Sequence, residues 1–264
     1  IMWGRQAIDK MMIMKQIKEN WKFLLFVLIS GLIGGYCIGL YFPAMMTEEM
    51  TKQMQEQNIT TDQLALITMI QYGIIYGVVL AAIGVGISKK VKLWKEFRYD
   101  KEAVVATSIV TIISAFLLYP GDKLIFGSFN SWVNGLYNET PSLPKIISGL
   151  FAGGVIEEVM LRLFMMSLIV LVISKIFCKD RENIPVKIYV IANVISAILF
   201  AAGHIPSTME MTTLTPLIIF RCFLFNGGIG LCFGYLYRKY CIGYAMISHG
   251  LCHLISDTLM VIFI

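Results

Sequence analysis

Residues 23–42 read FLLFVLISGLIGGYCIGLYF and contain no charged side chain. A helix needs roughly 20 apolar residues to cross the ~30 Å hydrocarbon core of a bilayer, and this run supplies them. The whole 264-residue chain has the same character, because 57% of it is hydrophobic and 15% is charged. An average soluble domain has an apolar share of roughly 45–50%. The sequence therefore predicts an all-α, polytopic transmembrane helical bundle.

The apolar runs predict about seven spans. They cover residues 23–42, 64–87, 103–119, 145–173, 188–205, 217–236 and 242–264. Residues 124–137 are half apolar and aromatic, so an eighth segment that re-enters or crosses the membrane is an alternative. We expect residues 23–264 to form one membrane domain. Residues 1–22 are interpreted as an amphipathic, interfacial segment or as sequence added ahead of a native start.

Lysine and arginine alternate between the segments that precede successive spans, with 5, 1, 6, 1, 4, 0 and 2 of them in chain order. Cytoplasmic loops retain an excess of these residues. The pattern predicts a cytoplasmic N-terminus and an external C-terminus. These loops account for the net charge of +5, and no basic stripe or phosphate loop indicates a nucleic-acid partner. The six cysteines contain no CxxC pair, which argues against disulfides or a cysteine metal site.

Ionisable residues inside apolar spans are costly and indicate a functional site. The first group lies in residues 149–166, GLFAGGVIEEVMLRLFMM. Glu158 and Arg162 are four residues apart on one helix face and can pair, whereas Glu157 points about 100° away. An acid without a cationic partner suits a general acid or base. The alternative is a purely structural salt bridge between helices.

The second group is Phe200 with His204, which share a helix face with Asn193. Pro206 follows closely, so we expect the helix to break at residues 203–206. We place this break at the floor of a cytoplasm-facing, water-filled cavity, where irregular backbone is tolerated.

The third group is a polar stripe formed by His249, His253 and Asp257 on the last span. Two histidines at i and i+4 have the spacing with which a helix binds one metal ion. The alternative is a stripe that faces other helices and holds water.

Together the three groups resemble the CAAX protease and bacteriocin-processing (CPBP) family of intramembrane proteases, also called Abi, which includes the type II CAAX prenyl endopeptidases. The family pattern is EExxxR, FxxxH and HxxxN or HxxxD, each in its own transmembrane helix. Residues 157–162 match the first motif, residues 200–204 the second, and His249 opens the third. The resemblance covers about residues 145–258, the expected catalytic core. His253 departs from the pattern, because it stands where the family has Asn or Asp.

The resemblance implies an intramembrane endopeptidase that cleaves a membrane-associated or prenylated peptide. It implies that Glu157 and His204 activate water. It also implies that His249 with His253 binds the oxyanion, since an imidazole N–H can donate in place of the Asn amide. The implied supporting residues are Glu158, Arg162 and Phe200.

Family members have been described both as metalloproteases and as glutamate-dependent proteases. We favour a reaction without a cofactor, because the resemblance points to it. Zinc is the alternative, and its ligands would be Glu157, His204, His249 and His253. The implied partners are a peptide or prenylated peptide and the lipid bilayer, in a prokaryotic plasma membrane with the active site facing the cytoplasm. The sequence does not indicate an oligomeric state.

Two other functions stay open. One is a non-catalytic membrane partner in peptide immunity or signalling. The other is a small ion-coupled transporter, because intramembrane Glu and His residues, with Arg221 and Asn226, also build proton relays.

Overall fold

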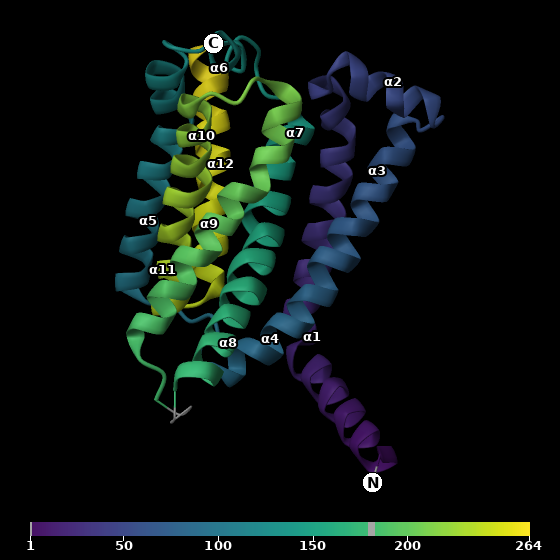
Figure 1. The fold of residues 1–264 in the computed structure, drawn as a ribbon, viewed down its shortest axis with the longest axis vertical. Coiled ribbons are helices and arrows are strands. Elements are labelled where there is room, and N and C mark those ends of the chain that lie inside the picture. Colours follow the sequence, from purple (N-terminus) through teal and green to yellow (C-terminus); the bar gives the residue numbers. More distant parts are fainter. Residues whose placement is uncertain (1, 179–182) are drawn as a thin grey trace.

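A computed structural model describes residues 2–178 and 183–264, and for residues 2–17 it describes the backbone alone. All regular structure in these ranges is helical. Seven of the described helices are long and apolar enough to cross a membrane: Lys18–Met45, Thr61–Lys90, Lys101–Phe126, Leu143–Phe177, Val186–Met211, Pro216–Lys239 and Ile242–Phe263. The predicted all-α bundle of seven spans is confirmed. The two termini lie at opposite ends of the molecule (Figure 1).

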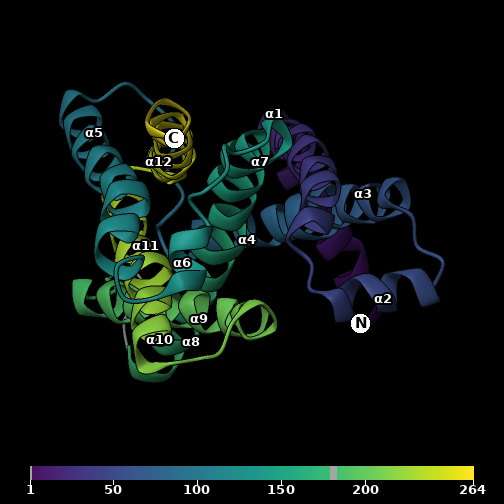
Figure 2. The ribbon, with the colours of Figure 1, turned by 90° about the horizontal axis from the view of Figure 1, so that it is seen from above.

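The N-terminal helices form an arm beside the other helices (Figures 1 and 2). In chain order its elements are α1 (Met2–Tyr41), η1 (Phe42–Met45), α2 (Glu48–Glu56), α3 (Thr61–Ile70), η2 (Gln71–Val79) and α4 (Leu80–Lys90). A capping box starts α3, because the Thr60 side chain accepts from the Gln63 backbone N–H and the Gln63 side chain accepts in return. A glycine allows α1 to pack closely here, since a Cβ on Gly35 would lie 2.5 Å from the Thr68 carbonyl oxygen.

The predicted interfacial segment at residues 1–22 falls on the first turns of α1, where the helix has non-helical backbone angles at Asn20. Its amphipathic character depends on side chains that lie outside the described residues.

The remaining elements form the main bundle. They are α5 (Lys101–Phe116), η3 (Leu117–Phe126), α6 (Ser131–Gly135), α7 (Leu143–Ser148), η4 (Gly149–Glu157), η5 (Val159–Met166), α8 (Ser167–Phe177), α9 (Val186–Met211), α10 (Pro216–Cys222), η6 (Phe223–Gly228), α11 (Ile229–Lys239) and α12 (Ile242–Phe263). The elements η2 to η6 are π-helical stretches inside longer helices, and such stretches are frequent at functional sites.

The span Leu143–Phe177 is the centre of the molecule, because its segments η4 and η5 contact α1, α4, α9 and α12. Val159, Leu163 and Met166 on η5 are completely buried. The outward face of α5 instead exposes large apolar side chains, at Ile109, Ile112, Ile113 and Phe116. This distribution suits a bundle with a packed interior and a lipid-facing perimeter.

A buried polar cluster joins η3, α10 and the segment after α6. Arg221 on α10 donates from Nε to Asp122 Oδ1 at 2.7 Å and from a second nitrogen to Oδ2. Tyr137 donates to the same carboxylate, and burial, followed by the charge of Asp122, raises the pKa of this phenol. The Asp122 side chain is thus the common acceptor that holds η3, α10 and the segment after α6 together.

Two sequence expectations are corrected. Residues 124–137 do not form an eighth span, since η3 ends at Phe126 and α6 is only five residues long. The helix also does not break at residues 203–206, because α9 continues through Pro206 to Met211. Proline removes one backbone hydrogen bond, whereas ending the helix inside the membrane would expose several unpaired backbone groups. The Ser207 and Thr208 hydroxyls also donate to the His204 carbonyl just beyond this point.

Helices η4 and α12 cross at two glycines, where a Cβ on Gly154 would lie 2.5 Å from the Cα of Gly250. We predict that Gly154→Ala destabilises the protein by about 1–3 kcal/mol, because the two backbones must separate. Gly203→Ala is the control, since a Cβ on Gly203 would meet no atom within 4 Å. Thermal unfolding in detergent measures both, and equal midpoints would contradict the close crossing.

Candidate active site

A cavity of about 100 Å³ lies among five spans of the bundle. Its lining residues are Leu118, Glu157, Phe200, His204, Phe225, Asn226, Ile229, Gly230, Phe233, His249, Cys252 and His253. A water needs only about 10–15 Å³ of such space, so the cavity has room for several. The structure therefore brings Glu157 and all three histidines, which come from three separate spans, to one cavity.

The two adjacent acids have different environments, as the helix spacing predicts. Glu158 is completely buried, and its Oε1 lies 3.1 Å from an Arg162 guanidinium nitrogen. Arg162 is also buried and donates to the Gly230 carbonyl at 2.9 Å. The Glu157 side chain is 28% exposed and faces the cavity. Glu158 is therefore paired with Arg162 and enclosed by protein, whereas Glu157 can reach water.

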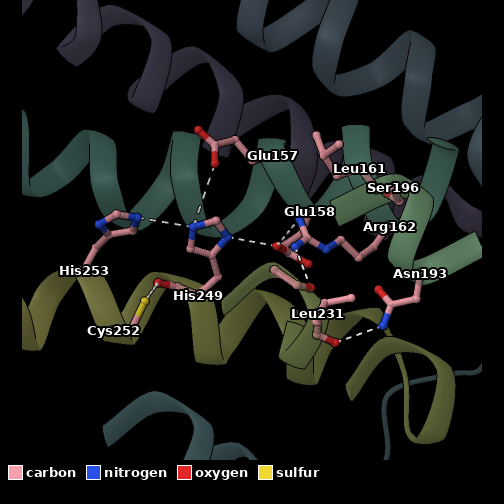
Figure 3. Close-up of polar contacts among 11 residues, drawn as sticks. Glu157, Glu158, Leu161, Arg162, Asn193, Ser196, Leu231, His249, Cys252 and His253 are labelled. Carbon is pink, nitrogen blue, oxygen red and sulfur yellow. Dashed lines mark hydrogen bonds and ion pairs between the residues drawn. The ribbon is translucent and has the colours of Figure 1, made fainter. Parts of the chain in front are cut away.

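His249 is held by groups from two neighbouring spans (Figure 3). Its Nδ1 lies 2.9 Å from Glu158 Oε1, and its Nε2 lies 3.8 Å from Glu157 Oε2. Its ring stacks on Phe233, with ring centroids 4.5 Å apart and an interplanar angle of 20°. The sequence analysis paired Glu158 with Arg162 alone, so its hydrogen bond to His249 is a contact that the sequence did not reveal.

His253 contacts His249 directly, with 3.2 Å between their Nε2 atoms (Figure 3). Helix η4 leaves room for this ring, because a Cβ on Gly153 would lie 3.3 Å from His253 Nε2 and one on Gly149 would lie 3.1 Å from its Cβ. The two glycines allow an imidazole to fit between η4 and α12.

His204 reaches the cavity from α9. Its Nδ1 lies 2.9 Å from the Phe200 carbonyl oxygen, and its ring packs edge-on against the Phe200 ring. A carbonyl oxygen can only accept, so Nδ1 carries the proton. The Nε2 of the neutral ring is then the basic nitrogen. The FxxxH pair thus fixes the tautomer of its own histidine.

Two residues that share a face with the histidines do not line the cavity. Asn193 donates to the Leu231 carbonyl on α11 at 2.9 Å. Asp257 forms an ion pair with Lys145, at 3.6 Å. In contrast, Phe233 lies against His249, but nothing in the sequence distinguishes it from the other aromatic residues of the apolar spans.

The zinc alternative can be tested against this geometry. Within residues 2–178 and 183–264, no group of three or more His, Cys, Asp or Glu side chains is arranged to hold a metal ion. The described residues as they lie therefore form no three-ligand metal site, and no chemical step is assigned to a metal.

Residues 139–255 match a family model described as Rce1-like, type II CAAX prenyl endopeptidase Rce1-like. This stretch includes every ionisable residue that lines the cavity. Over this stretch the chain is similar to that family. The match confirms the resemblance to the CPBP family and supports a CAAX-type intramembrane protease in general. No curated protein and no solved structure matches the chain.

Removal of Arg162 should destabilise the protein strongly. We predict that Arg162→Ala lowers the free energy of unfolding by about 3–5 kcal/mol, because it leaves the buried Glu158 carboxylate without its cation. Lys52→Ala is the control, since the Lys52–Glu56 pair is exposed and contributes about 0–1 kcal/mol. Denaturant titration in detergent compares the two variants. Similar losses would show that the Arg162 pair has no special structural weight.

Proposed function

We propose that the protein is an intramembrane endopeptidase that hydrolyses a peptide bond of a membrane-associated or prenylated peptide. The single observation that carries the proposal is the convergence of Glu157, His204, His249 and His253 on one small cavity inside the stretch that matches the Rce1-like family model. A carboxylate that can reach water and an imidazole with a basic Nε2 are the groups that general-base hydrolysis needs. The family supports a prenylated peptide and membrane lipid as partners in general.

In the proposed reaction a water molecule is bound in the cavity between Glu157 and His204. Glu157 takes a proton from this water, assisted by the basic Nε2 of His204, and the hydroxide attacks the peptide carbonyl carbon. The carbonyl oxygen becomes an oxyanion, which hydrogen-bond donors on α12 stabilise. The leaving amine then receives the proton. Arg162 and Glu158 act by holding His249 in place.

The size of the cavity bears on how a substrate binds. Sites that enclose drug-sized ligands have volumes of roughly 300–1,000 Å³, whereas this cavity has about 100 Å³. We propose that the cavity widens when a peptide enters from the membrane or from water. Phe200, Phe225 and Phe233 give its wall an apolar character that suits a lipidated or hydrophobic peptide.

We also propose an orientation. The basic segments around residues 89–101 and 238–239 lie at the same end of the molecule as the N-terminus (Figure 1). By the positive-inside rule this end faces the cytoplasm of a prokaryotic plasma membrane. We propose that the site opens to the cytoplasmic side.

The transporter alternative has less support. Two of the groups that it would use are already bonded within the protein, because Arg221 is held by Asp122 and Asn226 donates to the Cys222 carbonyl. A non-catalytic peptide-binding role would use the same cavity, and it would not need the Glu157 carboxylate.

Replacement of the proposed base should abolish cleavage without unfolding the protein. We predict that Glu157→Gln lowers kcat by about 10²–10⁴-fold, since it removes the general base while keeping the shape of the side chain. Glu210→Gln, at an exposed position near the end of α9, should keep full activity. Cleavage of prenylated and unmodified peptides by detergent-solubilised protein measures the effect. Undiminished hydrolysis by the purified Glu157→Gln protein would remove the mechanism.

The same assay decides metal dependence. We expect cleavage to persist after incubation with a zinc chelator, because Glu157 and His204 suffice to activate water in the proposed reaction. A matched sample receives the chelator together with excess zinc. Loss of activity that zinc restores would establish a metalloprotease instead.

A further inference from the structure

The proton positions in the His249–His253 pair follow from the groups around it. Glu158 is buried beside Arg162, and as a carboxylate it can only accept hydrogen bonds. The His249 nitrogen that faces it, Nδ1, must therefore carry a proton. In the neutral ring this leaves His249 Nε2 with a lone pair and no hydrogen.

His253 must then be the donor in its contact with His249. The two Nε2 atoms are 3.2 Å apart, and a hydrogen bond between them needs one proton. Since His249 Nε2 has none, the proton belongs to His253 Nε2. In the resting site both imidazole N–H groups are thus engaged, one with Glu158 and one with His249. This differs from the sequence expectation, in which both histidines donate to the oxyanion.

Glu157 is the carboxylate that faces the cavity beside the unprotonated Nε2 of His249. Glu157 Oε2 lies 3.8 Å from His249 Nε2, and Glu157 is the group that takes a proton from water in the proposed function. A small side-chain movement brings the two atoms within hydrogen-bond distance. Once protonated, His249 would carry a positive charge between the Glu158 carboxylate and the face of the Phe233 ring, and both stabilise a cation.

We propose, on the basis of the peptidase function above, that His249 accepts the water proton from Glu157 and that this transfer releases the His253 N–H for the oxyanion. An O–H bond of water breaks, the hydroxide oxygen bonds to the carbonyl carbon, and the proton moves through Glu157 to His249 Nε2. Because His249 Nε2 can then no longer accept, His253 Nε2–H turns to the oxyanion. When the C–N bond breaks, the proton returns through Glu157 to the leaving amine, so no proton is gained or lost.

The surrounding charges are consistent with a single additional proton on the pair. The ionisable groups around it are Glu157 from η4, Glu158 directly after η4, Arg162 from η5, His204 from α9, Lys145 from α7 and Asp257 from α12 itself. Arg162 is bonded to Glu158 and Lys145 to Asp257. Glu157 is therefore the acid left to balance a protonated His249.

The resting proton positions can be measured without a substrate. The chain has only three histidines, so ¹⁵N-histidine labelling of the full chain in lipid nanodiscs gives three ring systems, assigned with single His→Asn variants. Long-range ¹H–¹⁵N correlation should show protonated Nδ1 in His204 and His249 and protonated Nε2 in His253. Glu158→Gln should weaken the Nδ1–H preference of His249, and the matched Glu157→Gln should not. A protonated Nε2 in neutral His249 would overturn the proposal even if the protein cleaves peptides.

Kinetics test the role of the His253 N–H. His253→Asn keeps a side-chain N–H, so kcat should fall less than tenfold, whereas His253→Leu should lower kcat by about 100-fold or more with little change in KM. Near-equal, large losses in both folded variants would show that His253 acts through its lone pair and would overturn the proposal. Absence of cleavage in the wild-type protein would instead contradict the proposed function, and the tautomer measurement separates the two failures.

Discussion

The site depends on a series of two buried polar contacts, from Arg162 to Glu158 and from Glu158 to His249. Two charges lie here in an interior with almost no exposure, and burial of an ion is costly unless it is paired and hydrogen-bonded. Arg162 also donates to the Gly230 carbonyl, so these contacts connect the central span to both α11 and α12. Loss of any partner would leave a buried charge or donor unsatisfied. The relative positions of three helices are therefore coupled to these polar contacts.

The chemical roles that we propose for the cavity residues depend on this constraint. Because Glu158 is bound by Arg162 and His249, the adjacent Glu157 is the acid available to water. The same carboxylate sets the tautomer of His249, which in turn sets the donor in the His249–His253 contact. The Phe200 carbonyl does the same for His204. A small number of acceptors thus determines which nitrogen of His204 and of His249 is basic.

Most of the architecture could be predicted from residue order. Apolar runs of spanning length give the seven helices, and the four-residue spacing of Glu158 and Arg162 gives their ion pair. The errors have local causes. Residues 124–137 contain the end of η3 and the five-residue helix α6 instead of a further span, and Pro206 is tolerated inside α9 since only one hydrogen bond is lost. Neither outcome can be read from composition, because both depend on what the neighbouring helices cover.

By itself the sequence determined that the chain forms helices that cross a lipid bilayer, and which ionisable residues those helices carry. The reason is that the hydrophobic effect and helix periodicity act along the chain. It also determined the motifs that relate residues 139–255 to the Rce1-like proteases. Only the tertiary structure decided that Glu158 bonds His249, that Phe233 stacks on that ring and that His253 fits against Gly149 and Gly153. Those contacts join residues far apart in the chain. Their distances depend on how helices cross, and no local pattern in the sequence encodes a crossing.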